Sequence, residues 1–162
     1  IYILNYILKV KVDYMLININ PILSPDLLST LHSMGHGDTI VLADANFPSS
    51  SLSKKLIRLD GVDIPSAAKA ILSVFPLDSF IEYPVRRMEI DNKPEEINDI
   101  QHDFIEAVKS TAGERWKISS MERFKFYEET KKAYAVISTT DARAYGCFML
   151  TKGVIKPDGS VW

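Results

Sequence analysis

An amphipathic helix followed closely by an apolar strand is the feature that most limits how this chain can fold. Ser24 suits a helix N-cap and Pro25 the first helical position, so the sequence predicts a helix over 24–34. Gly35 is the expected stop, and the strand predicted over 39–43 is almost continuously apolar. Such a strand is typical of a sheet that is covered on both faces.

The rest of the chain continues this alternation of helices and strands. Further helices are predicted at 65–75, 94–110 and 121–132, strands at 57–59, 85–90, 133–138 and 147–150, and a loop at 46–51. No repeat or linker interrupts residues 15–162, and 162 residues can bury one proper core. The pattern therefore predicts a single α/β layered domain.

Residues 1–14 are interpreted separately from this domain. The segment is apolar, with Lys9 and Lys11 near its end, and Met15 reads as a natural start. It is too short to span a membrane, and its charges come too late for a signal peptide. We expect an N-terminal extension; an additional edge strand is the alternative, because Ile, Tyr and Val are common in strands.

Charge and cysteine content limit the partners and the compartment. The net charge of -2 and the pI of about 5.9 argue against a nucleic acid or an anionic membrane, since either would favour a basic surface. Cys147 is the single cysteine and cannot form an internal disulfide. Nothing therefore indicates an oxidising compartment, and we expect a cytoplasmic protein.

The segment Gly35-His36-Gly37-Asp38 is the strongest candidate for chemistry. An imidazole between two glycines, at the junction of a helix and a strand, is not an arrangement that core packing requires. The helix end favours a protonated ring, and Asp38 and Asp44 could supply carboxylate partners. A histidine that only caps the last helical carbonyls explains the residues equally well.

Other polar residues give weaker signals. His32 and His102 lie inside predicted helices and are interpreted as surface or partly packed side chains. There is no His-Glu-x-x-His motif and no cysteine pair, so no metal site is predicted. Gly35 and Gly37 follow a helix and precede a strand, which is the wrong order for a dinucleotide-binding motif.

Two later segments could contact a ligand. The Arg123 guanidinium could hold sugar hydroxyls or a carboxylate, although a charged, solvated helix face also explains this position. Tyr145-Gly146-Cys147 precedes the last apolar strand. It could be a β-turn, or an aromatic platform where Gly146 lets a ligand approach the backbone.

These segments occur together, and in the same order, in one known family. The matching stretches are Ser24-Pro25 with Leu27-Leu28, Met34-Gly35-His36-Gly37-Asp38, Ala43-Asp44-Ala45-Asn46-Phe47-Pro48, Ile57-Arg58 with Asp60-Gly61, Pro76-Leu77-Asp78, Glu122-Arg123-Phe124 with Phe126-Tyr127-Glu128, Lys132-Ala133, Tyr145-Gly146 and Lys152-Gly153-Val154. Over about residues 15–154 the chain resembles the fucose mutarotases, a branch of the group that includes the ribose pyranases. The resemblance implies a three-layer α/β/α domain with a central, mostly parallel or mixed sheet.

The resemblance also implies roles for individual residues. His36 matches the catalytic acid/base of the family, and Asp44 matches a substrate-binding aspartate. Asp38 is a supporting residue on the local sequence alone, as a carboxylate close to His36. Arg123 and the triplet Tyr145-Gly146-Cys147 match positions that line the sugar site. The ribose branch typically has histidine at the position of Arg123, which favours the fucose branch. The family usually has asparagine in place of Cys147, so a side-chain amide that could bind a sugar hydroxyl is absent here.

The implied activity is that of an L-fucose mutarotase, which interconverts the α and β anomers of the sugar by acid/base-catalysed ring opening and closure. An imidazole with a pKa of about 6.5 suits both proton transfers, and the reaction needs no cofactor or metal. The resemblance further implies a homo-oligomer, up to a decameric ring, with each site completed at a subunit contact. A D-ribose pyranase and a non-catalytic sugar-binding or regulatory module are the alternatives.

Overall fold

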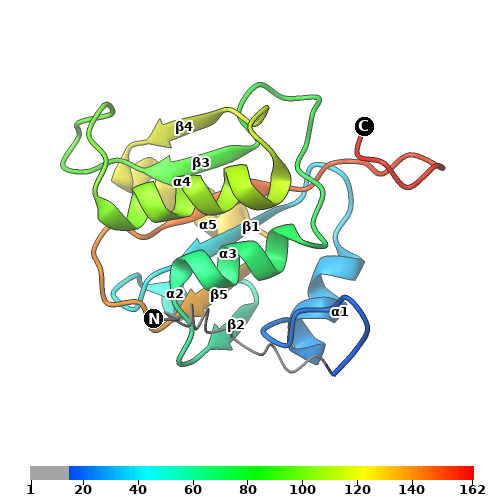
Figure 1. Cartoon of the computed structure of the whole chain (residues 1–162). Coiled ribbons are helices and arrows are strands. Elements are labelled where there is room, and N and C mark those ends of the chain that lie inside the picture. The colour runs from blue at the N-terminus through cyan, green and yellow to red at the C-terminus, as the bar shows by residue number, and fades with distance from the viewer. Residues whose placement is uncertain (1–14) are drawn as a thin grey trace, which may run out of the picture.

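The computed structural model describes residues 15–162, so the extension or edge strand expected at 1–14 lies outside the described residues. The elements are α1 (Pro25–Ser33), β1 (Thr39–Ala43), α2 (Ser49–Leu52), β2 (Leu56–Leu59), α3 (Ile64–Leu72), β3 (Val85–Met88), α4 (Asp99–Ala112), β4 (Ile118–Met121), α5 (Arg123–Lys132), β5 (Ala135–Thr139) and β6 (Phe148–Thr151). The strands form one sheet in the order β2-β5-β1-β6-β3-β4. Helices α3 and α4 cover one face, and α2 and α5 the other (Figure 1). The three-layer α/β/α prediction is confirmed.

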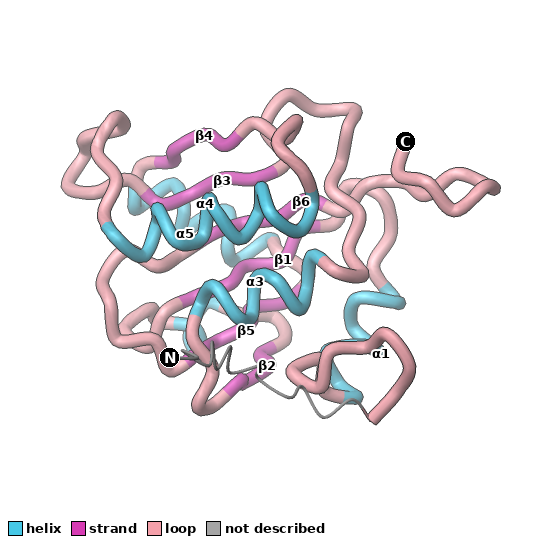
Figure 2. Tube along the Cα trace, viewed as in Figure 1, coloured by secondary structure: helices cyan, strands magenta, loops and turns pink. Residues whose placement is uncertain are grey.

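The sheet is mixed, because β6 runs against the other strands. β1 pairs in parallel with β5, β5 with β2, and β3 with β4. β6 is antiparallel to both β1 and β3 and so joins the two parallel parts (Figure 2). Since the parallel strands share one direction, we name the two ends of the sheet after β1: the amino end, where β1 begins, and the carboxyl end, where it stops.

The apolar run at 39–43 is β1, in the middle of the sheet, and Ile40 to Ala43 are each 0% exposed. Side chains alternate between the two faces of a strand. Ile40 and Leu42 belong to the core beneath α3 and α4, whereas Val41 and Ala43 belong to the core beneath α2 and α5. The strand has almost no polar residue because both of its faces are buried.

The helix boundaries follow from capping. Ser24 accepts a hydrogen bond from the Leu27 N–H at 3.3 Å, as its N-cap role predicts. The helix expected over 94–110 begins only at Asp99, because the Asn98 side chain caps it there by accepting from the Gln101 N–H. None of the helices within residues 15–162 has the length and the apolar run that crossing a bilayer requires.

Two short elements differ from the sequence prediction. The loop expected at 46–51 contains the single turn α2, and β4 forms where the sequence predicts no strand. Ser119 and Ser120 give β4 little strand preference. Its pairing with Arg86 and Arg87 of β3 is what defines it. The other predicted elements are present, with small shifts at their ends.

Candidate active site

His36 lies in the turn that joins α1 to β1, at the amino end of the sheet. Gly37 has a φ of 85°, a conformation that glycine adopts without steric cost, so the turn itself requires this glycine. Asp38 Oδ2 accepts a hydrogen bond from the Gly35 N–H at 2.8 Å. The carboxylate that the sequence suggests as an imidazole partner instead closes the turn.

Lys152, rather than His36, binds the carbonyls at the end of α1. Its Nζ donates to the Leu31 carbonyl at 2.7 Å and also to the Met34 carbonyl. A cation at a helix C-terminus is favoured by the helix dipole. Because the ammonium group takes these acceptors, the capping interpretation of His36 is wrong.

The partner of His36 is a buried carboxylate. His36 Nε2 lies 3.1 Å from Asp78 Oδ1; the side chain of Asp78 is 3% exposed, whereas that of His36 is 47% exposed. The same Oδ1 accepts a hydrogen bond from the Phe80 N–H at 3.0 Å. A carboxylate held in this way orients the imidazole. The pair therefore presents a fixed, half-exposed histidine ring.

Asp44 lies at the carboxyl end of the sheet and is occupied by contacts within the chain. Its Oδ1 accepts from the Asn46 N–H at 2.9 Å and the Phe47 N–H at 3.1 Å. Its Oδ2 accepts from the Gly146 N–H at 2.9 Å and lies 3.4 Å from the Cys147 Sγ. The residue is 3% exposed. Asp44 thus joins the loop after β1 to the loop before β6.

Gly146 and Cys147 are enclosed around this carboxylate. A Cβ atom at position 146 would lie 2.3 Å from Ile100 Cδ1 and 3.2 Å from Asp44 Cβ, so close packing requires the glycine. Cys147 is 2% exposed, and burial raises the pKa of its thiol well above the usual value. Its thiol lies against Asp44 and its carbonyl accepts from the Met88 N–H at 3.0 Å, so both groups are occupied by contacts within the chain.

Arg123 and Tyr145 line a small cavity beside this cluster. The cavity has a volume of about 80 Å³, and its walls are Glu89, Asp91, Asn92, Glu122, Arg123, Phe124 and Tyr145. The Tyr145 hydroxyl donates a hydrogen bond to Asp91 Oδ1, which raises the pKa of the phenol. The Arg123 guanidinium lies 4.7 Å from the centre of the Phe124 ring. Cation and phenol thus meet in one polar hollow.

The first turn of α4 holds Tyr145 in an unusual backbone conformation. Tyr145 has a φ of 63°, which is uncommon for a residue other than glycine and costs about 1–3 kcal/mol. Gln101 Nε2 donates to the Tyr145 carbonyl at 3.1 Å, and Asn98 Nδ2 donates to the Ala144 carbonyl at 2.9 Å. The start of α4 at Asp99 therefore also fixes the loop that carries the phenol.

The strand directions separate the predicted site residues into two groups. His36 precedes β1 and Asp44 follows it, and five strand residues at about 3.3 Å each span roughly 16 Å. Tyr145 to Cys147 precede β6, whose Phe148 pairs with Leu42 near the carboxyl end. Arg123 follows β4, which runs parallel to β3 toward that same end. Within one chain, His36 and the other candidates lie at opposite ends of the sheet.

Comparison with known proteins identifies the family. Residues 17–155 match the sequence model of the RbsD / FucU transport protein family. The chain belongs to the RbsD/FucU family. The L-fucose mutarotase of Haemophilus influenzae (strain 86-028NP) is 41% identical over 140 residues, which cover 86% of this chain and 97% of that protein.

Solved structures of RbsD/FucU proteins share the fold. The fucose mutarotase of Streptococcus pneumoniae, solved in complex with L-fucose, is 41% identical, with a TM-score of 0.81 over 87% of this chain and 100% of the other. Bacillus subtilis RbsD, solved with D-ribose, is 24% identical, with a TM-score of 0.65 over 83% of this chain and 95% of the other. At 24% identity, the similarity to RbsD supports the fold alone.

The sequence reasoning did not assign a role to two carboxylates that this RbsD/FucU chain places beside its candidates. Asp78 holds the His36 ring from a position 42 residues away, and Asp91 accepts from the Tyr145 hydroxyl from 54 residues away. Asp78 is part of a matching stretch, Pro76-Leu77-Asp78, which was the available signal. For Asp91 the local sequence offers none.

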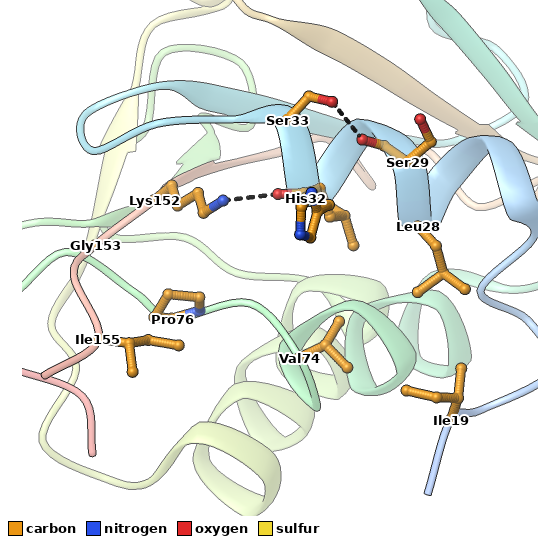
Figure 3. A pocket seen from close by; sticks show the side chains of 11 residues that line it. Ile19, Leu28, Ser29, His32, Ser33, Val74, Pro76, Lys152, Gly153 and Ile155 are labelled. Carbon is orange, nitrogen blue, oxygen red and sulfur yellow. Dashed lines mark hydrogen bonds between the residues drawn. The ribbon is translucent and has the colours of Figure 1, made fainter. Parts of the chain in front are cut away.

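A larger cavity lies elsewhere and suits a sugar poorly. It has a volume of about 730 Å³, lies between α1 and the segments around Val74 and Ile155, and includes none of the candidate residues (Figure 3). Its lining is mainly aliphatic, as Ile19, Leu28 and Val74 show, whereas a sugar needs convergent polar groups. Within the described residues, no group of three or more His, Cys, Asp or Glu could hold a metal ion.

Proposed function

We propose that the protein is an L-fucose mutarotase, an isomerase that interconverts the α and β anomers of L-fucose. The observation that carries the proposal is the half-exposed His36 ring held by the buried Asp78 carboxylate. Relatives with the same family membership and about the same fold carry the name L-fucose mutarotase, one of them with L-fucose bound. The chemistry requires a proton carrier and hydroxyl-binding groups, and the chain contains both.

We further propose that each site forms between two copies of the chain. The amino end of one subunit supplies His36 and Asp78, and the carboxyl end of a second supplies Arg123 and Tyr145. The separation of roughly 16 Å along β1 supports this arrangement, since one monosaccharide cannot bridge it. A contact between two different surfaces of identical subunits closes into a ring when the rotation permits. The family resemblance implies that this ring has as many as ten subunits.

The reaction moves two protons. The anomeric hydroxyl loses its proton, the ring oxygen gains one, the C1–O5 bond breaks, and rotation about C1–C2 precedes closure to the other anomer. With Nε2–H donated to Asp78, the Nδ1 lone pair of His36 can accept a proton, and Asp78 stabilises the resulting imidazolium. The same nitrogen returns the proton when the ring closes.

The carboxyl end supplies groups that bind the sugar hydroxyls. The Arg123 guanidinium can donate to vicinal hydroxyls in a forked geometry. The Tyr145 phenol keeps its proton near neutral pH, because its hydrogen bond to Asp91 raises its pKa. Its hydrogen is donated to Asp91, so the phenol oxygen can accept a hydrogen bond from a sugar hydroxyl, while a water molecule at the ring oxygen supplies the second proton and recovers it when the ring closes. Asp44 contributes by fixing the loop that holds Tyr145 and Gly146.

Saturation transfer between the anomeric protons of L-fucose, measured by NMR, tests the activity directly. His36→Ala should slow enzymatic exchange by roughly 10²–10⁴-fold, the usual contribution of general acid–base catalysis. His102→Ala is the matched control, because that ring lies exposed on α4 and should leave the rate unchanged. Near-full exchange in His36→Ala would remove His36 from the mechanism.

Mixing two inactive variants tests the shared site. His36→Ala keeps an intact carboxyl end, and Arg123→Ala keeps an intact amino end. After dissociation and reassembly together, roughly a quarter of the contacts should pair two intact halves, so activity should return. No recovery, with assembly verified by light scattering, would place each site within one subunit.

The same exchange assay separates the alternative functions. Faster pyranose–furanose exchange of D-ribose, without exchange of L-fucose anomers, would identify a ribose pyranase. Thermal stabilisation by L-fucose with no acceleration of exchange would identify a non-catalytic sugar-binding module. Arginine at position 123, where the ribose branch typically has histidine, favours L-fucose as the substrate. No described contact favours either alternative function.

A further inference from the structure

Two exposed aromatic rings extend from the candidate proton carrier. The Phe80 and His36 ring centroids are 5.3 Å apart at an interplanar angle of 52°. The Trp162 ring in turn stacks on the Phe80 ring: their centroids are 5.9 Å apart, at an interplanar angle of 26°. Phe80 is 58% exposed and Trp162 is 53% exposed. We call Phe80 and Trp162 the aromatic wall.

Phe80 is anchored through its backbone to the same Asp78 carboxylate that contacts His36. Asp78 Oδ1 accepts from the Phe80 N–H at 3.0 Å and contacts His36 Nε2 at 3.1 Å, so ring 36 and residue 80 share one anchor. Their relative position is thus set by a buried group.

A short hairpin places Trp162 beside Phe80. Ile155 and Val161 form a β-bridge, the Lys156 N–H donates to the Ser160 carbonyl at 2.8 Å, and the Trp162 N–H donates to the Val154 carbonyl at 3.0 Å. The family match ends at residue 155, so Trp162 comes from a segment beyond the matched region.

The chemistry of the wall suits one part of a 6-deoxy sugar. Aromatic rings offer apolar surface, and each CH₂-sized group that they cover gains about 0.8 kcal/mol. A hydroxyl placed against such a surface loses water without gaining a partner, which costs free energy. A methyl group and ring C–H bonds fit the wall, whereas a hydroxymethyl group does not.

We propose that Phe80 and Trp162 bind the apolar edge of the sugar beside His36 and select a C6 methyl group over a C6 hydroxymethyl group. This inference rests on the proposed mutarotase function. L-Galactose differs from L-fucose by a hydroxyl on C6, and D-arabinose lacks C6. The wall should favour L-fucose over both.

The test compares anomer exchange of these three sugars in the wild type, Trp162→Ala and the conservative control Trp162→Phe. Trp162→Ala should raise KM for L-fucose about ten-fold with kcat nearly unchanged, since a pocket contact with a methyl-sized group is worth about that factor. The preference for L-fucose over L-galactose should fall by a similar factor. Trp162→Phe should keep most of the preference, and the mass by light scattering should not change.

Other outcomes would overturn the inference. Unchanged KM and unchanged sugar preference in both Trp162→Ala and Phe80→Leu would show that the wall does not touch the sugar. An equal loss for all three sugars, or a change in oligomeric mass, would make the wall a packing surface between subunits. A wild-type protein that accelerates exchange of no sugar would instead refute the proposed function.

Discussion

The two ends of the sheet are built on opposite principles. At the carboxyl end, Asp44 is buried and both of its oxygens are bonded to chain atoms, so the loops that carry Tyr145 and Gly146 are preorganised. At the amino end, His36 is half exposed and its ring is hydrogen-bonded to Asp78. In the proposed mechanism, the carboxyl end is a rigid binding surface and the amino end carries the proton-transfer residue. Changes at the buried Asp44 cluster should therefore mainly reduce stability, and changes at the His36–Asp78 pair should mainly reduce rate.

The largest effect on stability is expected for Asp44→Ala. The substitution leaves the N–H groups of Asn46, Phe47 and Gly146 without their acceptor, at about 1–3 kcal/mol for each buried group left unsatisfied. We expect a total loss of about 3–4 kcal/mol in the free energy of unfolding, measured by urea denaturation. Asp38→Ala removes one hydrogen bond in the turn at the amino end and should cost about 1 kcal/mol. Equal losses would contradict the difference between the ends.

Asp78→Asn should slow anomer exchange strongly while changing the free energy of unfolding only slightly. The amide still fits the site but no longer stabilises an imidazolium, so we expect exchange to slow by roughly 100-fold while the free energy of unfolding changes by about 1 kcal/mol or less. Anomer exchange and urea denaturation on the same sample measure both quantities. A normal rate would show that His36 works without its carboxylate.

Gly146→Ala sharpens the comparison of packing. A Cβ atom there meets Ile100 Cδ1 at 2.3 Å, and overpacking of this kind costs about 1–3 kcal/mol. Gly35→Ala is the matched control at the amino end, where the nearest atom to a new Cβ is Asp38 Oδ2 at 3.8 Å. We expect thermal unfolding to show a clear drop in Tm for the first variant and almost none for the second. Similar drops would mean that the two ends are equally tightly packed.

The smallest effect concerns acid stability at the carboxyl end. Hydrogen bonds from the Arg143 side chain lower the pKa of Asp141, which also accepts from the Ile64 N–H. A carboxyl whose pKa is lower in the folded state adds stability above its unfolded pKa of about 3.9, and this stability is lost as the pH falls through the folded value. Asp141→Asn should therefore flatten the decline in stability below about pH 4. An unchanged acid slope in urea titrations would show that the pair contributes nothing.

The elements that the sequence predicted well are those specified by local patterns. Ser24 and Pro25 mark the start of α1, and the apolar run at 39–43 marks a strand that is buried on both faces. The sequence did not predict β4, because Ser119 and Ser120 acquire strand structure only from their pairing with β3, which is a long-range contact. The start of α4 was misplaced because the Asn98 cap outweighed Pro94 as the boundary.

What the sequence by itself determined is the α/β alternation, the unusual histidine between two glycines, and the ordered set of motifs shared with the RbsD/FucU family. What only the tertiary structure decided is where these residues lie. Asp78 joins His36 from 42 residues away, Asp44 turns inward to hold Gly146, and β1 separates His36 from Arg123 and Tyr145. The physical reason is that hydrogen-bond partners and strand directions depend on how distant segments pack, and local residue patterns do not encode that packing.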